Sequence, residues 1–220
     1  MTRVDFTASL HNATKRDYVA RVVENDKAAC AEVASRFGEE YWDGDRRYGY
    51  GGYRYDGRWL PVAQAIASHY ALKAGDRLLD VGCGKGFLLH ELTVAVPGLV
   101  VAGLDVSAYA VAHAHAPVKP FLVEGRAEAL PYDDDAFDVV ISLGALHNLG
   151  AAALFAALAE IERVARRGAY VMVESYRDER EKANLLYWQL TCRSFYSVED
   201  WEFVFRQAGY SGDYGFIFFE

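Results

Sequence analysis

The sequence predicts an α/β fold in which helices cover both faces of a doubly wound, mostly parallel sheet. Three observations support this prediction. From residue 77 onward, short apolar runs alternate with longer helical stretches, the pattern of successive βαβ units. A glycine-rich turn follows the first apolar run. The chain has 220 residues, 52% of them hydrophobic, and is therefore long enough to bury the core of one such domain.

The apolar runs and the stretches between them define the expected elements of the core. Strands are predicted at residues 78–82, 100–105, 120–123, 137–143 and 169–174. Helices are predicted between them, at residues 87–96, 108–113 and 151–166. After residue 174 we expect a helix at 177–189, a second helix that Ser197 caps and that ends before Gly209, and a terminal strand at 214–219. Either residues 191–196 supply one more strand or the sheet has six.

The first 70 residues have a different composition. Residues 1–37 are expected to be helical with polar breaks, best between 28 and 37. In residues 40–60 glycines alternate with aromatic residues, which fits an ordered loop better than a helix or a regular strand. Residues 61–70 begin with proline and have helical apolar spacing, so they are predicted to form a helix.

Charge and composition exclude several classes of protein. The net charge is −8 and the basic pairs Arg46-Arg47 and Arg166-Arg167 lie among acidic residues, which argues against a nucleic-acid partner. No apolar run approaches the roughly 20 residues that cross a bilayer, and residues 1–15 lack the apolar stretch of a signal peptide. Three widely spaced cysteines form no disulfide framework. We expect a cytoplasmic monomer or homodimer.

The strongest motif is LLDVGCGKGFLL at residues 78–89. Its glycines, at 82, 84 and 86, let the chain turn tightly and bring backbone amides close to a ligand at a helix N-terminus. A dinucleotide fingerprint would need glycine or alanine at position 87, where this chain has Phe87. Asp105, about 20 residues further on, is placed to bind ribose hydroxyls. Taken singly, the glycines could be a plain strand-to-helix turn and Asp105 a helix cap.

These motifs together resemble those of class I S-adenosylmethionine-dependent methyltransferases of the small-molecule type, over about residues 73–209. The resemblance implies a Rossmann-like fold with an antiparallel C-terminal strand and S-adenosyl-L-methionine as the cofactor. It implies that the methionine part is held by Asp80, Gly82, Cys83, Gly84 and Gly86. Ribose and adenine would be held by Asp105 and Val106, with Ala127 and Glu128 beside the adenine and Leu143 at the methionine end. Arg126 stands where members of the family often carry aspartate.

Methyl transfer is an in-line displacement, so such an enzyme mainly positions the acceptor atom and removes its proton. His147, just past the fourth strand, is the candidate base, because imidazole titrates near neutrality. The alternative is a structural histidine. No metal is expected, because Ser142, Leu143 and Gly144 stand where metal-dependent relatives place carboxylates. The acidic run 133–135 is expected to be a solvated loop.

Acceptor selection is expected outside a cofactor-binding core at residues 71–174. Residues 1–70 would form a lid and residues 175–220 a second wall. Candidate contacts in the lid are Tyr48, Tyr50, Tyr53 and Arg58, and those in the wall are Arg177 and Tyr187. Phenol and guanidinium groups donate hydrogen bonds, which suits a small polar or anionic acceptor. The alternative is that the aromatic segment packs on the core or forms a dimer contact.

Two stretches, YGYGGYRYDGRW and NLLYWQLTC, resemble methyltransferases encoded with cell-surface polysaccharide enzymes. That resemblance implies a sugar, phosphoramidate or amino-acid-like acceptor. Two other functions remain open at this point. One is transfer to a protein or RNA nitrogen, against which the acidic charge argues. The other is a catalytically silent module that binds the cofactor and supports a partner.

Overall fold

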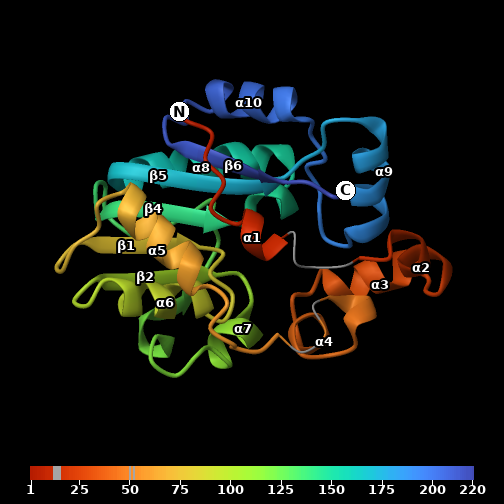
Figure 1. Cartoon of the computed structure of the whole chain (residues 1–220), viewed down its shortest axis with the longest axis horizontal. Helices are drawn as coiled ribbons and strands as arrows, with labels where there is room; N and C mark the ends of the chain where they lie inside the picture. Colours follow the sequence, from red (N-terminus) through yellow and green to blue (C-terminus); the bar gives the residue numbers. More distant parts are fainter. Residues whose placement is uncertain (12–15, 50, 52) are drawn as a thin grey trace.

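A computed structural model describes residues 1–11, 16–49, 51 and 53–220. Its centre is a six-stranded sheet with the order β3-β2-β1-β4-β5-β6 (Figure 1). The strands are β1 (Arg77–Val81), β2 (Val100–Asp105), β3 (Leu122–Glu124), β4 (Phe137–Leu143), β5 (Ala165–Glu174) and β6 (Asp213–Ile217). All neighbouring strands are parallel. The predicted α/β fold with a doubly wound sheet is therefore confirmed.

The strand order reverses between β1 and β4. β1 pairs with β2 on one side, Asp80 opposite Gly103, and with β4 on the other, Asp80 opposite Ile141. β1 and β4 are almost completely buried, which explains why their sequences are mainly apolar. In such a sheet the crevice for ligands opens at the carboxyl ends of the strands, where the order reverses. The glycine-rich turn begins at that point, directly after β1.

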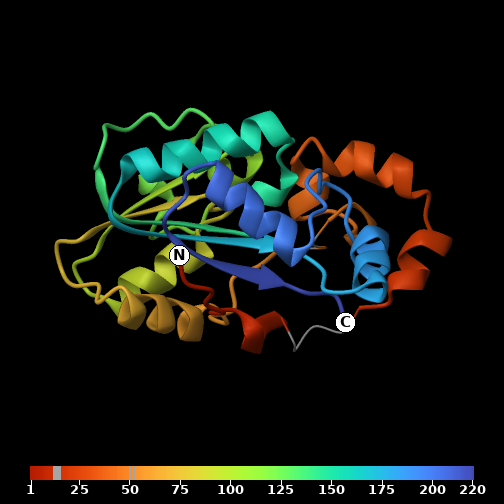
Figure 2. The ribbon, with the colours of Figure 1, turned by 90° about the horizontal axis from the view of Figure 1, so that it is seen from above.

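Helices cover both faces of the sheet, as Figure 2 shows. On one face α5 (Leu60–His69) and α6 (Phe87–Ala95) pack against the strands through Ile66, Leu89 and Leu92. On the other face α8 (Ala151–Val164) and α10 (Val198–Gln207) bury apolar side chains, among them Leu158, Ile161, Trp201 and Phe205. Shorter elements complete the core: α7 (Ala108–Ala112), η2 (Lys119–Phe121) and η3 (Leu146–Asn148).

The prediction of an antiparallel C-terminal strand is wrong. β6 runs parallel to β5, with Tyr170 opposite Asp213 and Glu174 opposite Ile217. The reason is the connection between them. α9 (Glu179–Trp188) and α10 carry the chain back to the starting end of the sheet, and a crossover of that kind joins parallel strands. Residues 191–196 form no strand, so the six-stranded alternative holds.

The prediction that the N-terminal segment is helical from residue 1 is wrong, because the first helix begins at Ala8. Thr2 and Val4 bond to the free edge of β6, through Tyr214 N to Thr2 O (3.0 Å) and Val4 N to Tyr214 O (2.8 Å). Short helices follow: α1 (Ala8–His11), α2 (Tyr18–Val23), α3 (Lys27–Ala34), α4 (Glu39–Trp42) and η1 (Arg46–Tyr48). Figure 1 shows α2, α3 and α9 standing together beyond the carboxyl ends of the strands.

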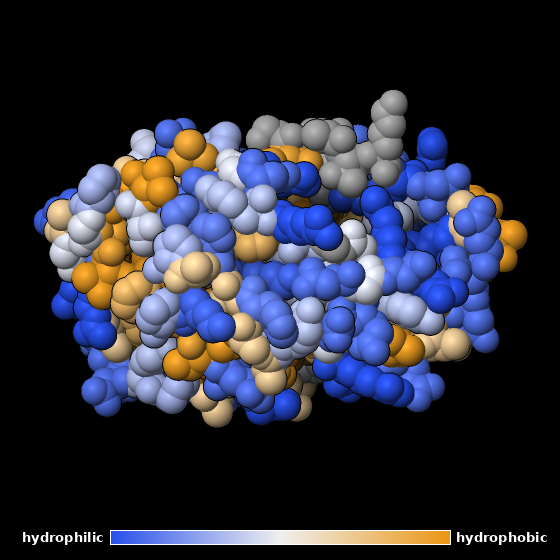
Figure 3. All heavy atoms as spheres, turned by 90° about the horizontal axis from the view of Figure 1, so that it is seen from below, coloured by the Kyte–Doolittle hydropathy of each residue, from blue (hydrophilic) through white to orange (hydrophobic). Residues whose placement is uncertain are grey.

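The surface is mainly polar. Figure 3 shows one face, on which hydrophilic side chains predominate and hydrophobic ones form separate groups. Among the described residues, no helix is both long and apolar enough to cross a bilayer.

Candidate active site

A pocket of about 1170 Å³ lies at the carboxyl ends of the strands, where the strand order reverses. This volume exceeds the roughly 300–1000 Å³ of a pocket for one small ligand, so it can hold a nucleoside-sized cofactor together with a small acceptor. Its floor is made by the ends of β1, β2, β4 and β5, and its walls come from the N-terminal segment and the residues after α9.

The glycine-rich turn forms the centre of the pocket. Gly82 and Gly84 have positive φ angles of 83° and 54°, where side chains are strained. A Cβ on Gly82 would lie 2.3 Å from the Cβ of Ala145, and a Cβ on Gly84 would lie 2.7 Å from the ring of Trp42. The turn can therefore pack against Ala145 and Trp42 in this conformation only with glycine at both positions. Cys83 also lines the pocket, whereas Gly86 packs against Val118 and Leu122 behind it.

Two buried carboxylates stand beside this turn. Asp105 accepts hydrogen bonds from the backbone amides of Gly84 (2.7 Å) and Ser107 (2.8 Å), which fix the turn against β2. Burial raises the pKa of Asp80 to about 8, and the nearby charge of Asp105 adds to the increase. Burial also raises the pKa of Asp105. A ligand that brings a positive charge and hydroxyl donors would stabilise the ionised forms of these two carboxyl groups.

Further predicted cofactor residues lie around the same pocket. The lining includes Val106, Ala127, Glu128 and Leu143. Arg126, which departs from the family's usual aspartate, forms an ion pair with Glu128 at the pocket rim. The structure thus brings together every predicted cofactor residue except Gly86 on one pocket surface.

His147 does not reach that surface. It is 3% exposed and burial lowers the pKa of its imidazole to about 3, so the ring is neutral. Its Nδ1 lies 3.4 Å from the backbone nitrogen of Glu174, which donates to it. The structure therefore places His147 behind the pocket, against a carboxylate that does line it.

That carboxylate, Glu174, ends β5 and was missed by the sequence reasoning. It is 7% exposed, and burial raises its pKa to about 8 although the bond from Gln189 and the charge of Arg16 act in the opposite direction. Gln189 donates to Oε1. Oε2 has no hydrogen-bond partner among the described residues and lies 3.4 Å from His147 Nε2. The sequence around Glu174 does not predict that its carboxyl group is buried beside His147.

The aromatic segment after η1 covers one side of the pocket. Tyr53 stacks on Phe87 at the start of α6, with ring centroids 5.0 Å apart, and Tyr55 donates to Glu91 at 2.7 Å. Tyr53 and Arg58 line the pocket, whereas Tyr48 does not. Tyr50 lies outside the described residues. The segment thus packs on the core and also borders the pocket, so the two interpretations left open are compatible.

Trp42 and Asp43 hold this segment against the glycine-rich turn. Trp42 Nε1 donates to Ser107 Oγ at 2.9 Å while its ring rests on Gly84. Lys85, buried within the turn, forms an ion pair with Asp43 at 2.6 Å. The sequence did not predict these contacts, because the partners are more than 40 positions apart.

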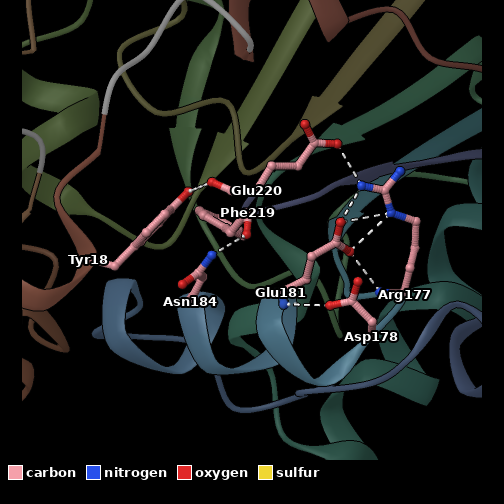
Figure 4. A network of polar contacts seen from close by, with 7 residues as sticks. All are labelled: Tyr18, Arg177, Asp178, Glu181, Asn184, Phe219 and Glu220. Carbon is pink, nitrogen blue, oxygen red and sulfur yellow. Dashed lines mark hydrogen bonds and ion pairs between the residues drawn. The ribbon is translucent and has the colours of Figure 1, made fainter.

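Arg177 and Tyr187 lie away from the pocket. Arg177 binds Glu181 and, at 2.6 Å, Glu220, as Figure 4 shows. In the same network Asn184 donates to the carbonyl of Phe219 at 2.9 Å. These contacts fasten α9 to the C-terminal residues. The wall of the pocket is instead formed by residues 188–191 and Arg193.

The strand order, the glycine-rich turn at its reversal and the carboxylate after β2 define the class I S-adenosylmethionine-dependent methyltransferases. Comparison with known proteins agrees: residues 79–173 match the family model described as a methyltransferase domain. Residues 79–173 therefore form a methyltransferase domain of this kind, whose cofactor is S-adenosyl-L-methionine. Within the described residues, no three His, Cys, Asp or Glu side chains are grouped to hold a metal ion.

Individual relatives are similar over part of their length. An uncharacterized methyltransferase of Synechocystis sp. is 34% identical, with 57% of each chain covered. A phthiotriol/phenolphthiotriol dimycocerosates methyltransferase of Mycobacterium ulcerans is 35% identical, covering 53% of this chain and 43% of that one. The chain thus spans about half the length of these relatives. A solved putative methyltransferase of Haloferax volcanii, in complex with the activator Trm112, has a TM-score of 0.56, 26% identity and coverage of 85% and 77%.

Proposed function

We propose that this protein transfers the methyl group of S-adenosylmethionine to an oxygen or nitrogen atom of a small polar metabolite. The proposal rests on one pocket whose lining has two distinct parts. One part is the glycine-rich turn with Asp80 and Asp105, and the other is polar surface from the N-terminal segment and the residues after α9. The Mycobacterium ulcerans relative is named for phthiotriol and phenolphthiotriol dimycocerosates, which are neither proteins nor nucleic acids, and this supports a small-molecule acceptor.

The cofactor part fits S-adenosylmethionine chemically. Asp80 would pair with its cationic methionine end, Asp105 would accept from ribose hydroxyls with its remaining lone pairs, and Ala127 would border the adenine. When bound, the cofactor supplies the methyl group and its own leaving group. The chain's residues then have to orient the acceptor, exclude water and take up a proton.

The proton step is proposed for Glu174 rather than for His147. A general base must reach the acceptor and be unprotonated, and His147 is separated from the pocket lining by Glu174. Glu174 lines the pocket, and within the part of the chain that the structure describes one of its oxygens accepts no hydrogen bond. His147 and Gln189 would hold the carboxyl group in place. His147 is thereby a positioning residue in this proposal.

The test is a tritiated-methyl transfer assay across fractionated metabolite pools. Label should enter a small-molecule fraction. Label that enters only protein or RNA would instead favour the alternative acceptors, and a folded protein that binds cofactor but transfers nothing would favour a silent module. A sugar or amino-acid-like compound in the labelled fraction would support the polysaccharide setting.

Calorimetric titration with S-adenosylhomocysteine tests the cofactor site separately. Asp105→Ala should weaken binding by about 1–3 kcal/mol, because a charge-assisted hydrogen-bond pair is lost. Asp133→Ala, in the solvated acidic loop, should leave the affinity unchanged. Equal affinity of both folded variants would contradict the assignment.

A further inference from the structure

Three arginines surround the ring of Trp188 at the end of α9. The guanidinium carbons of Arg16, Arg21 and Arg46 lie 5.5, 4.5 and 5.9 Å from the ring centroid. Arg16 lies two positions before α2, Arg21 belongs to α2 and Arg46 begins η1. All four side chains line the pocket. The cluster is the more notable because the whole chain carries a net charge of −8.

Protein carboxylates do not neutralise this cluster fully. Arg21 donates to two neutral carbonyls, of Trp188 (2.7 Å) and of Arg46 (3.1 Å). Across residues 1–11, 16–49, 51 and 53–220, neither Arg21 nor Arg46 forms an ion pair with a carboxylate. These two positive groups therefore face the pocket without a negative partner from the described chain.

Holding these charges together is unfavourable without a ligand. Burial lowers the pKa of Arg21, and the neighbouring charge of Arg46 lowers it further. Burial lowers the pKa of Arg16 as well; Tyr18 and the charge of Glu174 act in the opposite direction, and the charge of Arg46 lowers it further. Arg16 and Arg21 are partly buried, whereas Arg46 is exposed. Positive groups that lie this close to one another are stabilised by an anion placed between them. Guanidinium is well suited to bind a carboxylate or phosphate with two parallel hydrogen bonds.

We propose that Arg16, Arg21 and Arg46 form an oxyanion-binding subsite, which takes a carboxylate or phosphate group of the methyl acceptor. This inference rests on the proposed function and narrows its acceptor to an anionic metabolite. The subsite lies on the side of the pocket formed by α2 and α9, whereas the glycine-rich turn follows β1. The bound anion would therefore fix one end of the acceptor and turn its other end toward the cofactor.

The experiment titrates inorganic phosphate into the protein at low ionic strength, with and without saturating S-adenosylhomocysteine, by calorimetry. Wild type should bind phosphate equally well in both conditions. Arg46→Gln and Arg21→Lys should each weaken phosphate binding by about tenfold or more, because a charge or the planar donor pair is lost. Arg47→Gln is the matched control: it changes the next residue of η1, which is exposed like Arg46 but does not line the pocket.

Three outcomes would overturn the subsite. They are no phosphate binding by wild type, equal binding by Arg46→Gln, and loss of phosphate binding when S-adenosylhomocysteine is present. The last would show that these arginines serve the cofactor's own carboxylate. Failure of the proposed function is seen separately, as wild type that does not bind S-adenosylhomocysteine at all. Retained affinity for that ligand in the arginine variants shows that they are folded.

Discussion

Glu174 and His147 show how burial changes the chemistry of single residues. The pKa of the carboxyl group is raised to about 8 and that of the imidazole is lowered to about 3. Histidine is the more familiar base near neutrality. Here the same desolvation that keeps the imidazole neutral makes the carboxylate basic enough to accept a proton from a hydroxyl or ammonium group.

Glu174→Gln should lower kcat by at least about a hundredfold, the scale of general base catalysis. With the acceptor from the pool assay, the wild-type rate should rise with pH and level off above about 8, where the carboxyl group is ionised. The glutamine variant should lose this rise. His147→Asn should move the rise without abolishing it. A glutamine variant that keeps the wild-type pH profile would disprove the role.

At the scale of elements, the segment around Trp42 and Tyr53 packs on the glycine-rich turn and on the start of α6. Trp42 rests on Gly84, and Tyr53 stacks on the first residue of α6. A cofactor bound on the glycine-rich turn would therefore contact or restrain the same segment. A loop that closes over a reacting group also excludes water from it.

Binding of S-adenosylhomocysteine should slow hydrogen exchange of the amides in residues 53–59. The physical reason is that ligand contacts add to the packing of this segment on α6 and reduce its local opening. Mass spectrometry of peptic fragments measures the effect, and a peptide covering β6 serves as the unresponsive control. If exchange in 53–59 is the same with and without ligand, the segment is a fixed part of the core and not a lid.

The elements differ in how well the sequence predicted them. The strands of the core were predicted because buried parallel strands read as continuous apolar runs between glycine turns. α10 was predicted from its cap, and Ser197 does accept from the amide of Asp200. The short helices before residue 50 carry little amphipathic signal of their own. Their positions are set by contacts such as that of α2 with α9, far apart in the sequence.

The candidate site was predicted in the same uneven way. Gly82, Gly84 and Asp105 belong to a local motif, so the sequence located them. Arg21 and Glu174 have environments that only the assembled fold creates, the one beside Trp188 and the other beside His147. The direction of β6 was mispredicted because it depends on the crossover through α9 and α10 and not on the residues of the strand.

At the scale of the whole molecule, buried ionisable groups should give stability a definite pH dependence. The folded pKa values of Asp80 and Glu174 are about 8, against 3.8 and 4.5 for the free groups. Their protonated forms favour folding, so this contribution is complete below about pH 4 and is lost as pH rises to 8. His147 acts oppositely: its pKa falls from 6.5 to about 3, so stability is lost as pH falls through that range.

The free energy of unfolding of the wild type should therefore fall between pH 5.5 and 8.5. In Asp80→Asn this fall should be smaller by at least about 1 kcal/mol, since one pKa unit corresponds to about 1.4 kcal/mol. Urea denaturation at the two pH values measures this difference. Asp133→Asn, in an exposed loop, should leave it unchanged. Identical pH dependence in wild type and Asp80→Asn would show that Asp80 titrates normally in the folded protein.

The pairing of residues 2–4 with β6 has a consequence for the order of folding. The backbone nitrogen of Thr2 also bonds to Asp213, 211 positions away, at 2.9 Å. Contacts between such distant residues close a long loop and tend to form late, after more local pairings have reduced its effective length. We expect the parallel core to fold first and the N-terminal segment to dock on it last. Arg16 and Arg21 would then reach Trp188 only in that final step. The side of the pocket formed by α2 and α9 would therefore be the last to assemble, and it would also be the first to open.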